Sequence, residues 1–150
     1  MTPLEHLLDQ LVQKWRVDGI EIQRGVLEDE VRAFEQRTHV ELPPDVLTYL
    51  RVIDGMPESA MDAGLFRFWR LREYDAASAV LPRDPTVFDG YFVFADHSIE
   101  AEHFGVAMGR TSPGAVVMVG DRPWRVASSF QQFIELYLRD SDVLLRPERD

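Results

Sequence analysis

The chain of 150 residues contains no cysteine. Disulfides, thiolate zinc sites and thiol nucleophiles are therefore excluded, because each of them needs a cysteine sulfur. Several classes of metalloprotein and covalent hydrolase are removed by this one absence.

Basic residues are also scarce. The chain has 16 lysine and arginine residues against 26 aspartate and glutamate residues, which gives a formal net charge of −10 at pH 7. Nucleic acids and anionic membrane surfaces repel a chain of this charge at long range. We therefore expect neither as a partner, and a basic protein surface is the natural complement.

Long apolar runs are missing. No stretch approaches the ~20 consecutive apolar residues that a membrane span needs. The first ten residues carry Glu5 and Asp9 where a secretory signal peptide is apolar, and no positively charged segment precedes them. These features predict a cytoplasmic protein.

Motifs for cofactors and for nucleophilic catalysis are missing as well. Gly105 and Gly109 do not form a G-x-G-x-x-G phosphate loop after a strand, and no G-x-x-x-x-G-K-S/T sequence occurs. Ser128 and Ser129 stand at a predicted helix start and not in a G-x-S-x-G elbow. We expect no cofactor and no enzymatic activity.

The residues that are present predict one globular domain. Apolar residues make up 45% of the chain, and at this length a single hydrophobic core is normal. The domain is expected to cover residues 1–150, with a core from about residue 4 to residue 138 and a polar tail over residues 140–150. No internal repeat and no linker divides it.

Helical patterns occupy the first third and the end of the chain. Thr2 and Glu5 form a T-x-x-E capping box before an apolar stripe that runs from Leu4 to Trp15. Residues 27–37 carry three acids, residues 28–30, in their first turn, and residues 44–54 begin with proline; both features are typical of helix starts. A final S-x-x-Q box at Ser129 precedes a stripe that ends at Leu138.

Strand patterns fill the middle. The segments are short and rich in aromatic and β-branched residues, and Gly, Pro and Asp separate them. They are residues 65–71, 91–95, 103–108, 115–119 and 124–126. Helices first, then a block of strands, then a helix predicts the α+β class: a mostly antiparallel twisted sheet with helices packed on one face.

A family resemblance rests on these same segments. Residues 25–55, GVLEDEVRAFEQRTHVELPPDVLTYLRVIDG, resemble the signature of the SUKH superfamily in its Smi/Knr-like branch: a helix with an acidic start, a turn, Leu-Pro, a second helix and a closing pair. LFRFWRL, YFVFADHSI, AVVMV and VASSFQQFIELYL follow in the order that this family has. Asp54-Gly55 stands where Asn-Gly is more usual, and residues 98–103 replace a turn that is often richer in glycine.

The resemblance implies a function. Bacterial members of the superfamily are mostly immunity proteins that bind and neutralise a cognate toxin of a polymorphic toxin system, often a nuclease, and fungal members regulate through protein contacts. The first expectation is therefore an immunity protein that binds a toxin directly. The alternative is a regulatory or scaffold protein that binds a cellular protein.

Two segments without any cation are the candidate partner-binding region. Between Val52 and Phe66, and again between Asp84 and Gly109, every charged residue is acidic. If the two segments lie at the same end of the sheet, their carboxylates form one acidic patch, with Met56 and Met61 as apolar anchors. The predicted partner-binding residues are Asp54, Glu58, Asp62, Trp69, Tyr91, Asp96, Glu100 and Glu102.

The stretch from Asp96 to His103 allows a second interpretation. Asp96, His97, Glu102 and His103 are residue types that bind divalent metals, so a small metal-dependent enzyme is a weaker alternative. Alternation in the flanking strands instead makes residues 97–102 an outward turn, in which Asp96 and Ser98 bond to the backbone. We therefore predict no metal site.

Overall fold

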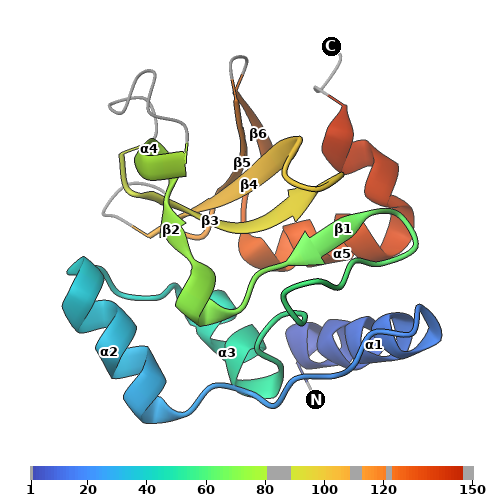
Figure 1. The fold of residues 1–150 in the computed structure, drawn as a ribbon, viewed down its shortest axis with the longest axis horizontal. Coiled ribbons are helices and arrows are strands. Elements are labelled where there is room, and N and C mark those ends of the chain that lie inside the picture. The colour runs from blue at the N-terminus through green and yellow to red at the C-terminus, as the bar shows by residue number, and fades with distance from the viewer. Residues whose placement is uncertain (1, 81–88, 109–112, 121–122, 147–150) are drawn as a thin grey trace.

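The computed structural model describes residues 2–80, 89–108, 113–120 and 123–146. Six strands form one antiparallel sheet in the order β1-β3-β4-β5-β6, and β2 also pairs with β3 (Figure 1). The strands are β1 (Phe66–Phe68), β2 (Asp75–Ala76), β3 (Tyr91–His97), β4 (Glu102–Ala107), β5 (Val116–Val119) and β6 (Trp124–Ala127). The predicted fold class, a single α+β domain with an antiparallel sheet, is confirmed.

Four of the five α-helices, all except α4, lie where capping and periodicity predict them. They are α1 (Pro3–Val17), α2 (Glu28–Thr38), α3 (Pro44–Val52), the short α4 (Ala77–Val80) and α5 (Phe130–Asp140). Thr2 and Glu5 close a reciprocal capping box on α1, and the Ser129 hydroxyl accepts from the Gln132 backbone N–H at the start of α5. None of the described helices is long and apolar enough to span a membrane.

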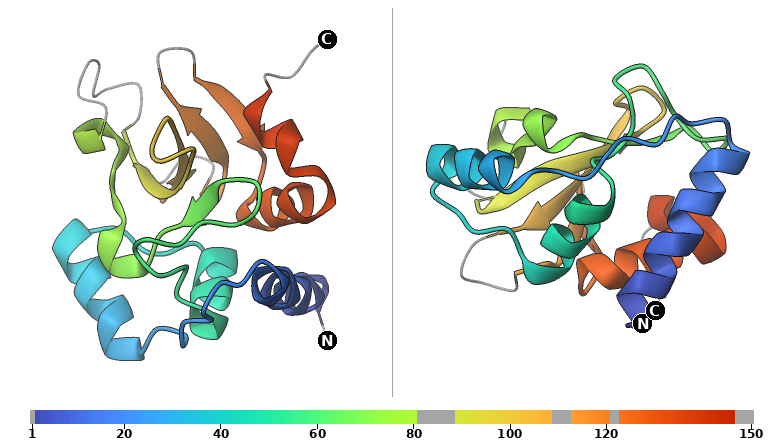
Figure 2. Two further views of the ribbon diagram at one scale, coloured as in Figure 1. Left: turned by 45° about the vertical axis from the view of Figure 1, so that its right-hand side comes forward. Right: turned by 90° about the horizontal axis from the view of Figure 1, so that it is seen from below.

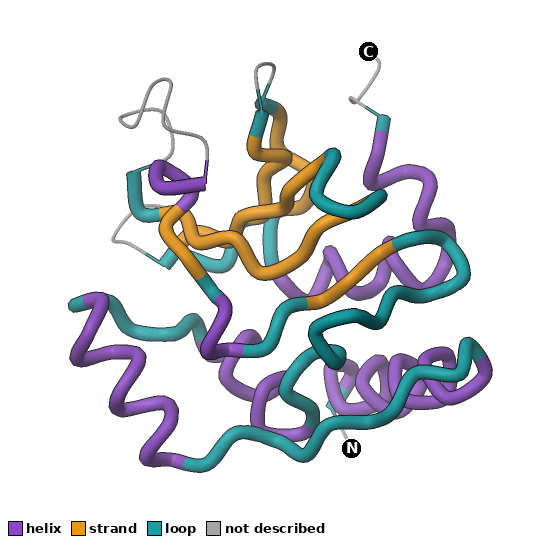
Figure 3. The backbone as a smooth tube through the Cα atoms, in the orientation of Figure 1, coloured by secondary structure: helices purple, strands orange, loops and turns teal. Residues whose placement is uncertain are grey.

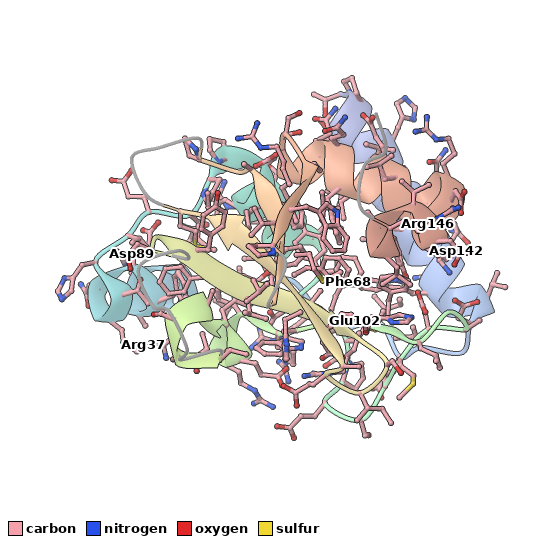
Figure 4. The ribbon with its side chains drawn as sticks, turned by 90° about the horizontal axis from the view of Figure 1, so that it is seen from above. Arg37, Phe68, Asp89, Glu102, Asp142 and Arg146 are labelled. Atoms are coloured by element: carbon pink, nitrogen blue, oxygen red, sulfur yellow. The ribbon has the colours of Figure 1, made fainter. Side chains whose placement is uncertain are left out.

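The core lies between one face of the sheet and helices α1, α3 and α5, which Figure 2 shows on the same side. Phe68 is at its centre (Figure 4), with its ring 5.2 Å from that of Trp15 on α1 and 4.9 Å from that of Tyr137 on α5. Tyr49 on α3 packs against Phe68 from a third direction. Edge-to-face aromatic pairs of this kind stabilise a core beyond the apolar area they bury.

The strand register brings a different set of residues together on the opposite face. Arg67 of β1 pairs with Asp96 of β3, and Asp96 pairs with His103 of β4, so the three side chains form one row across the sheet. Trp69, which directly follows β1, contacts this row through its indole N–H. The candidate site lies at the end of this row.

Short elements with no strong local pattern were not predicted. β2 and α4 occupy residues 75–80, and a 3-10 helix covers Ser141–Leu145. Leu144 is fully buried, so the predicted polar tail is wrong for this segment, while residues 147–150 lie outside the described part. Strands β5 and β6 are antiparallel neighbours in the sheet, and residues 121–122 between them also lie outside the described part.

Candidate functional site

Two loops meet at one end of the sheet. The first, residues 57–65, is the exit loop that leads from α3 into β1, and the second, residues 98–101, is the β3–β4 turn. The Ser98 backbone N–H donates to the Leu65 carbonyl at 3.0 Å, and His97 Nε2 lies 3.0 Å from the Gly64 carbonyl oxygen. Figures 2 and 3 show the loops side by side. The two loops therefore lie at the same end of the sheet, the condition on which the acidic patch depended, and we call this surface the loop face.

Asp96 is not a surface carboxylate of the loop face. Its residue is only 3% exposed, and it accepts from the Trp69 indole N–H at 2.6 Å and from the Glu100 backbone N–H at 3.2 Å. Arg67 Nε is 3.5 Å away. The hydrogen bond to Glu100 confirms the predicted role of Asp96 in the turn, and Trp69 is buried as its donor and does not act as an exposed anchor.

Asp62 is also buried at 3% exposure, where it organises the exit loop. It accepts from the backbone N–H groups of Gly64 and Phe66 at 2.8 and 2.9 Å, and from the hydroxyl of Tyr137. Tyr137 in turn accepts from the Trp15 indole N–H at 3.0 Å. Burial, together with the charge of Asp62, raises the pKa of the Tyr137 hydroxyl far above its ordinary value, so this group stays a donor.

Asp54 is the third buried aspartate. It is 3% exposed and accepts from the Leu71 backbone N–H at 2.7 Å, with Arg70 Nε 3.4 Å away. Burial and the charge of Asp54 raise the pKa of the neighbouring Tyr74 hydroxyl. The prediction that these three aspartates form an exposed acidic patch is therefore wrong, because each one is used to satisfy buried donors of its own chain.

Two predicted anchors are also misplaced. Met56 is fully buried and packs in the core. Tyr91 is half-buried at the first residue of β3, six residues before His97 at the other end of that strand. At a rise of about 3.4 Å per residue this separates Tyr91 from the loop face by roughly 20 Å.

Five acidic or large apolar side chains remain on the surface of the loop face. Glu58 and Glu100 are exposed acids. Three of the seven large apolar side chains that the described residues expose stand beside them: Met61 at 36%, Leu65 at 45% and Ile99 at 80%. Sequence reasoning did not select Leu65 and Ile99, since exposure of a single apolar residue leaves no local pattern.

These side chains border a groove of about 240 Å³. Met61 and Leu65 come from the exit loop and Ile99 from the β3–β4 turn, while Arg67 and Asp96 on the sheet also line it. The Arg67 guanidinium is held by both carboxylate oxygens of Glu73, at 3.1 and 3.2 Å. The groove is therefore an apolar slot with acidic side chains at its rim.

The histidines of this region are engaged by neighbours. His97 lies between the Glu102 carboxylate, 3.2 Å from Nδ1, and the Gly64 carbonyl, and His103 Nε2 is 3.2 Å from the Glu100 carboxylate. Glu102 is thus half-buried beside the loop face. No group of three or more acidic or histidine side chains with the arrangement of a metal site occurs in the described part of the chain.

A second groove, of about 540 Å³, lies toward the other end of the sheet. It runs between the end of α2 and strand β2, and Arg37, Arg72, Glu73 and Asp75 line it. Figure 4 shows Arg37 on the opposite side of the molecule from Glu102. Its charges are of both signs, so they indicate no single class of ligand.

No protein-family model and no curated protein matches this chain. The loop face and the fold therefore carry the functional argument.

Proposed function

We propose that the chain acts in the cytoplasm by binding another protein, as an immunity protein that neutralises a cognate bacterial toxin. The observation that carries the proposal is the composition of the loop face. Two loops distant in the sequence meet there and expose Met61, Leu65 and Ile99 between acidic side chains. An apolar centre with a charged rim is the usual anatomy of a protein-binding surface.

The order of the elements supports the same proposal. Residues 25–55, on which the resemblance to the SUKH superfamily chiefly rests, fold into α2, the Leu-Pro turn and α3, and the exit loop follows directly. A net charge of −10 favours a basic partner, since opposite charge raises the rate of encounter. Toxins that act on nucleic acid present such surfaces to their substrates.

The competing function is regulation of a cellular protein through the same face. Gene context separates the two, because an immunity gene stands beside the gene of its toxin. The test is to purify the tagged chain together with the product of that neighbouring gene at low and at high salt. A salt-sensitive 1:1 complex that abolishes the toxicity of the product is expected. Toxicity that persists when both proteins are present at equal concentration would refute the immunity function.

A further inference from the structure

We infer that the groove of the loop face receives a single cationic side chain, arginine or lysine, from a segment of the partner that also carries an apolar residue. This inference rests on the proposed function in that the occupant belongs to a protein. It adds the chemistry of the occupant and the place where it binds.

The size of the groove favours a side chain over a small-molecule ligand. Its volume is about 240 Å³. Sites for small molecules and cofactors enclose about 300–1,000 Å³ and bury most of the ligand. A slot below this range fits one extended side chain and part of a neighbouring one.

The walls match the stem of a long basic side chain. Met61 and Leu65 line the groove from the exit loop, and Ile99 lines it from the β3–β4 turn. Lysine and arginine bury their methylene stems against apolar surface and leave the charged group at the polar edge. The three apolar side chains supply that surface.

The charges match the head of such a side chain. The lining includes three carboxylates, those of Glu58, Asp96 and Glu100, against one cation, Arg67. Arg67 is already bound by Glu73 outside the groove and by Asp96 within it. A second cation is therefore attracted to Glu58 and Glu100 at the rim, whereas an acidic side chain would be repelled there.

The β3–β4 turn holds its part of the groove in a defined shape. Its residues 98–100 all have left-handed backbone angles, with φ of 55°, 53° and 62°. The Asp96 carboxylate accepts from the Glu100 N–H, and the turn is bonded to the exit loop through Ser98 and Leu65. A preformed wall reduces the loss of conformational freedom on binding.

The experiment uses the full chain labelled with ¹⁵N and two capped peptides, Ac-Leu-Arg-Leu-NH₂ and Ac-Leu-Gln-Leu-NH₂. The arginine peptide is expected to shift the backbone amide signals of residues 58–65 and 98–101, and the glutamine peptide to shift them much less. Equal shifts with both peptides, or shifts centred on another surface, would overturn the inference.

A matched pair of variants isolates the rim charges. The double variant Glu58→Gln, Glu100→Gln should bind the arginine peptide about fivefold more weakly, because two exposed charge pairs are lost. The control, Glu21→Gln with Glu41→Gln, changes the net charge equally at two exposed acids outside the groove. Equal weakening in both variants would assign the effect to net charge and contradict the groove.

The same variants separate this inference from the proposed function. A neighbouring toxin that binds the wild type and the Glu58, Glu100 variant with equal affinity would overturn the groove and leave immunity standing. If the chain binds the arginine peptide selectively but leaves the toxin active, the inference about the groove is upheld and the immunity function is refuted.

Discussion

The aspartates of this chain are structural at the level of the single residue. Asp54, Asp62 and Asp96 each lie 3% exposed and accept hydrogen bonds from donors of their own chain. Removing one partner of such a pair leaves a buried polar group without a hydrogen bond, and the resulting loss of stability is larger than the net contribution of the bond. Acidic residues in the loops therefore divide into buried organisers and exposed rim residues, and only the second class is available to a partner.

Two tyrosines test this division. Tyr137→Phe removes the donor to Asp62 and should lower the free energy of unfolding by about 1.5–3 kcal/mol, the range for hydrogen bonds to charged groups. Tyr74 is the control, because its buried hydroxyl has no hydrogen-bond partner among the described residues, so Tyr74→Phe should be close to neutral. Urea unfolding of both variants measures the difference. Equal losses would contradict the organising role of Asp62.

Three buried tyrosine hydroxyls predict that the folded state loses stability at alkaline pH. Burial raises the pKa values of Tyr49, Tyr74 and Tyr137 in the folded state, while the unfolded chain ionises them near the ordinary value of about 10. The folded state therefore holds more protons above pH 10, and stability is present below that pH and falls as the pH rises. The slope approaches about 1.4 kcal/mol per pH unit for each tyrosine.

Tyr74→Phe supplies the comparison for this pH dependence. Urea unfolding at about pH 9 and about pH 11 should show a smaller loss of stability for the variant than for the wild type, by about 1.4 kcal/mol over this whole range. Identical slopes would show that Tyr74 ionises in the folded state as it does in the unfolded chain. The chain has a single lysine, Lys14, so few other groups titrate in this range.

At the level of the element, the β3–β4 turn combines backbone strain with exposure. Ile99 has a φ of 53° and is 80% exposed, although β-branched residues strongly disfavour the left-handed region. Because the side chain is exposed, packing within this chain does not offset that cost. An exposed apolar residue in such a conformation is consistent with a contact made to a partner.

Replacement of Ile99 by asparagine separates stability from binding. Asparagine tolerates the left-handed region, so Ile99→Asn should raise the free energy of unfolding by about 1 kcal/mol. The same variant should bind the arginine peptide more weakly, because one apolar wall of the groove is lost. Ile99→Val keeps the β-branch and should change neither strongly. A less stable Ile99→Asn variant would contradict this account of the turn.

Local signals explain which elements could be predicted. The capping box at Thr2, the acidic start of α2 and the aromatic run of β3 are each formed by residues close together in the sequence, so the sequence displays them directly. The 3-10 helix over Ser141–Leu145 is held by the burial of Leu144 and has no such signal.

Long-range pairing explains why the site was only partly predicted. The meeting of the two loops follows from the antiparallel pairing of β1 with β3, which no pattern within either strand reveals. The burial of Asp62 depends on Tyr137, 75 residues away, and that of Asp96 on Trp69, 27 residues away. A carboxylate with a distant donor is indistinguishable in sequence from a solvated one.

At the level of the whole molecule, the helices and the candidate binding surface lie on different parts of the sheet. Helices α1, α3 and α5 cover one face of the sheet, and the loop face occupies the end where the exit loop meets the β3–β4 turn (Figure 2). Under the proposed function, the net charge of −10 attracts a basic partner from a distance, and the exposed apolar residues of the loop face supply the contact. Attraction at long range and recognition at close range therefore come from different residues.

The most direct test of the proposed function is the dissociation constant between this chain and the product of its neighbouring gene, the proposed toxin. Met61→Ser with Ile99→Ser should weaken that complex by about tenfold or more, since truncation of central apolar contacts costs more than 1 kcal/mol. Val17→Ser with Val52→Ser, two exposed apolar residues that do not line the groove, should leave it within about twofold. Equal affinity of the two double variants, or no complex with the wild type, would contradict binding through the loop face.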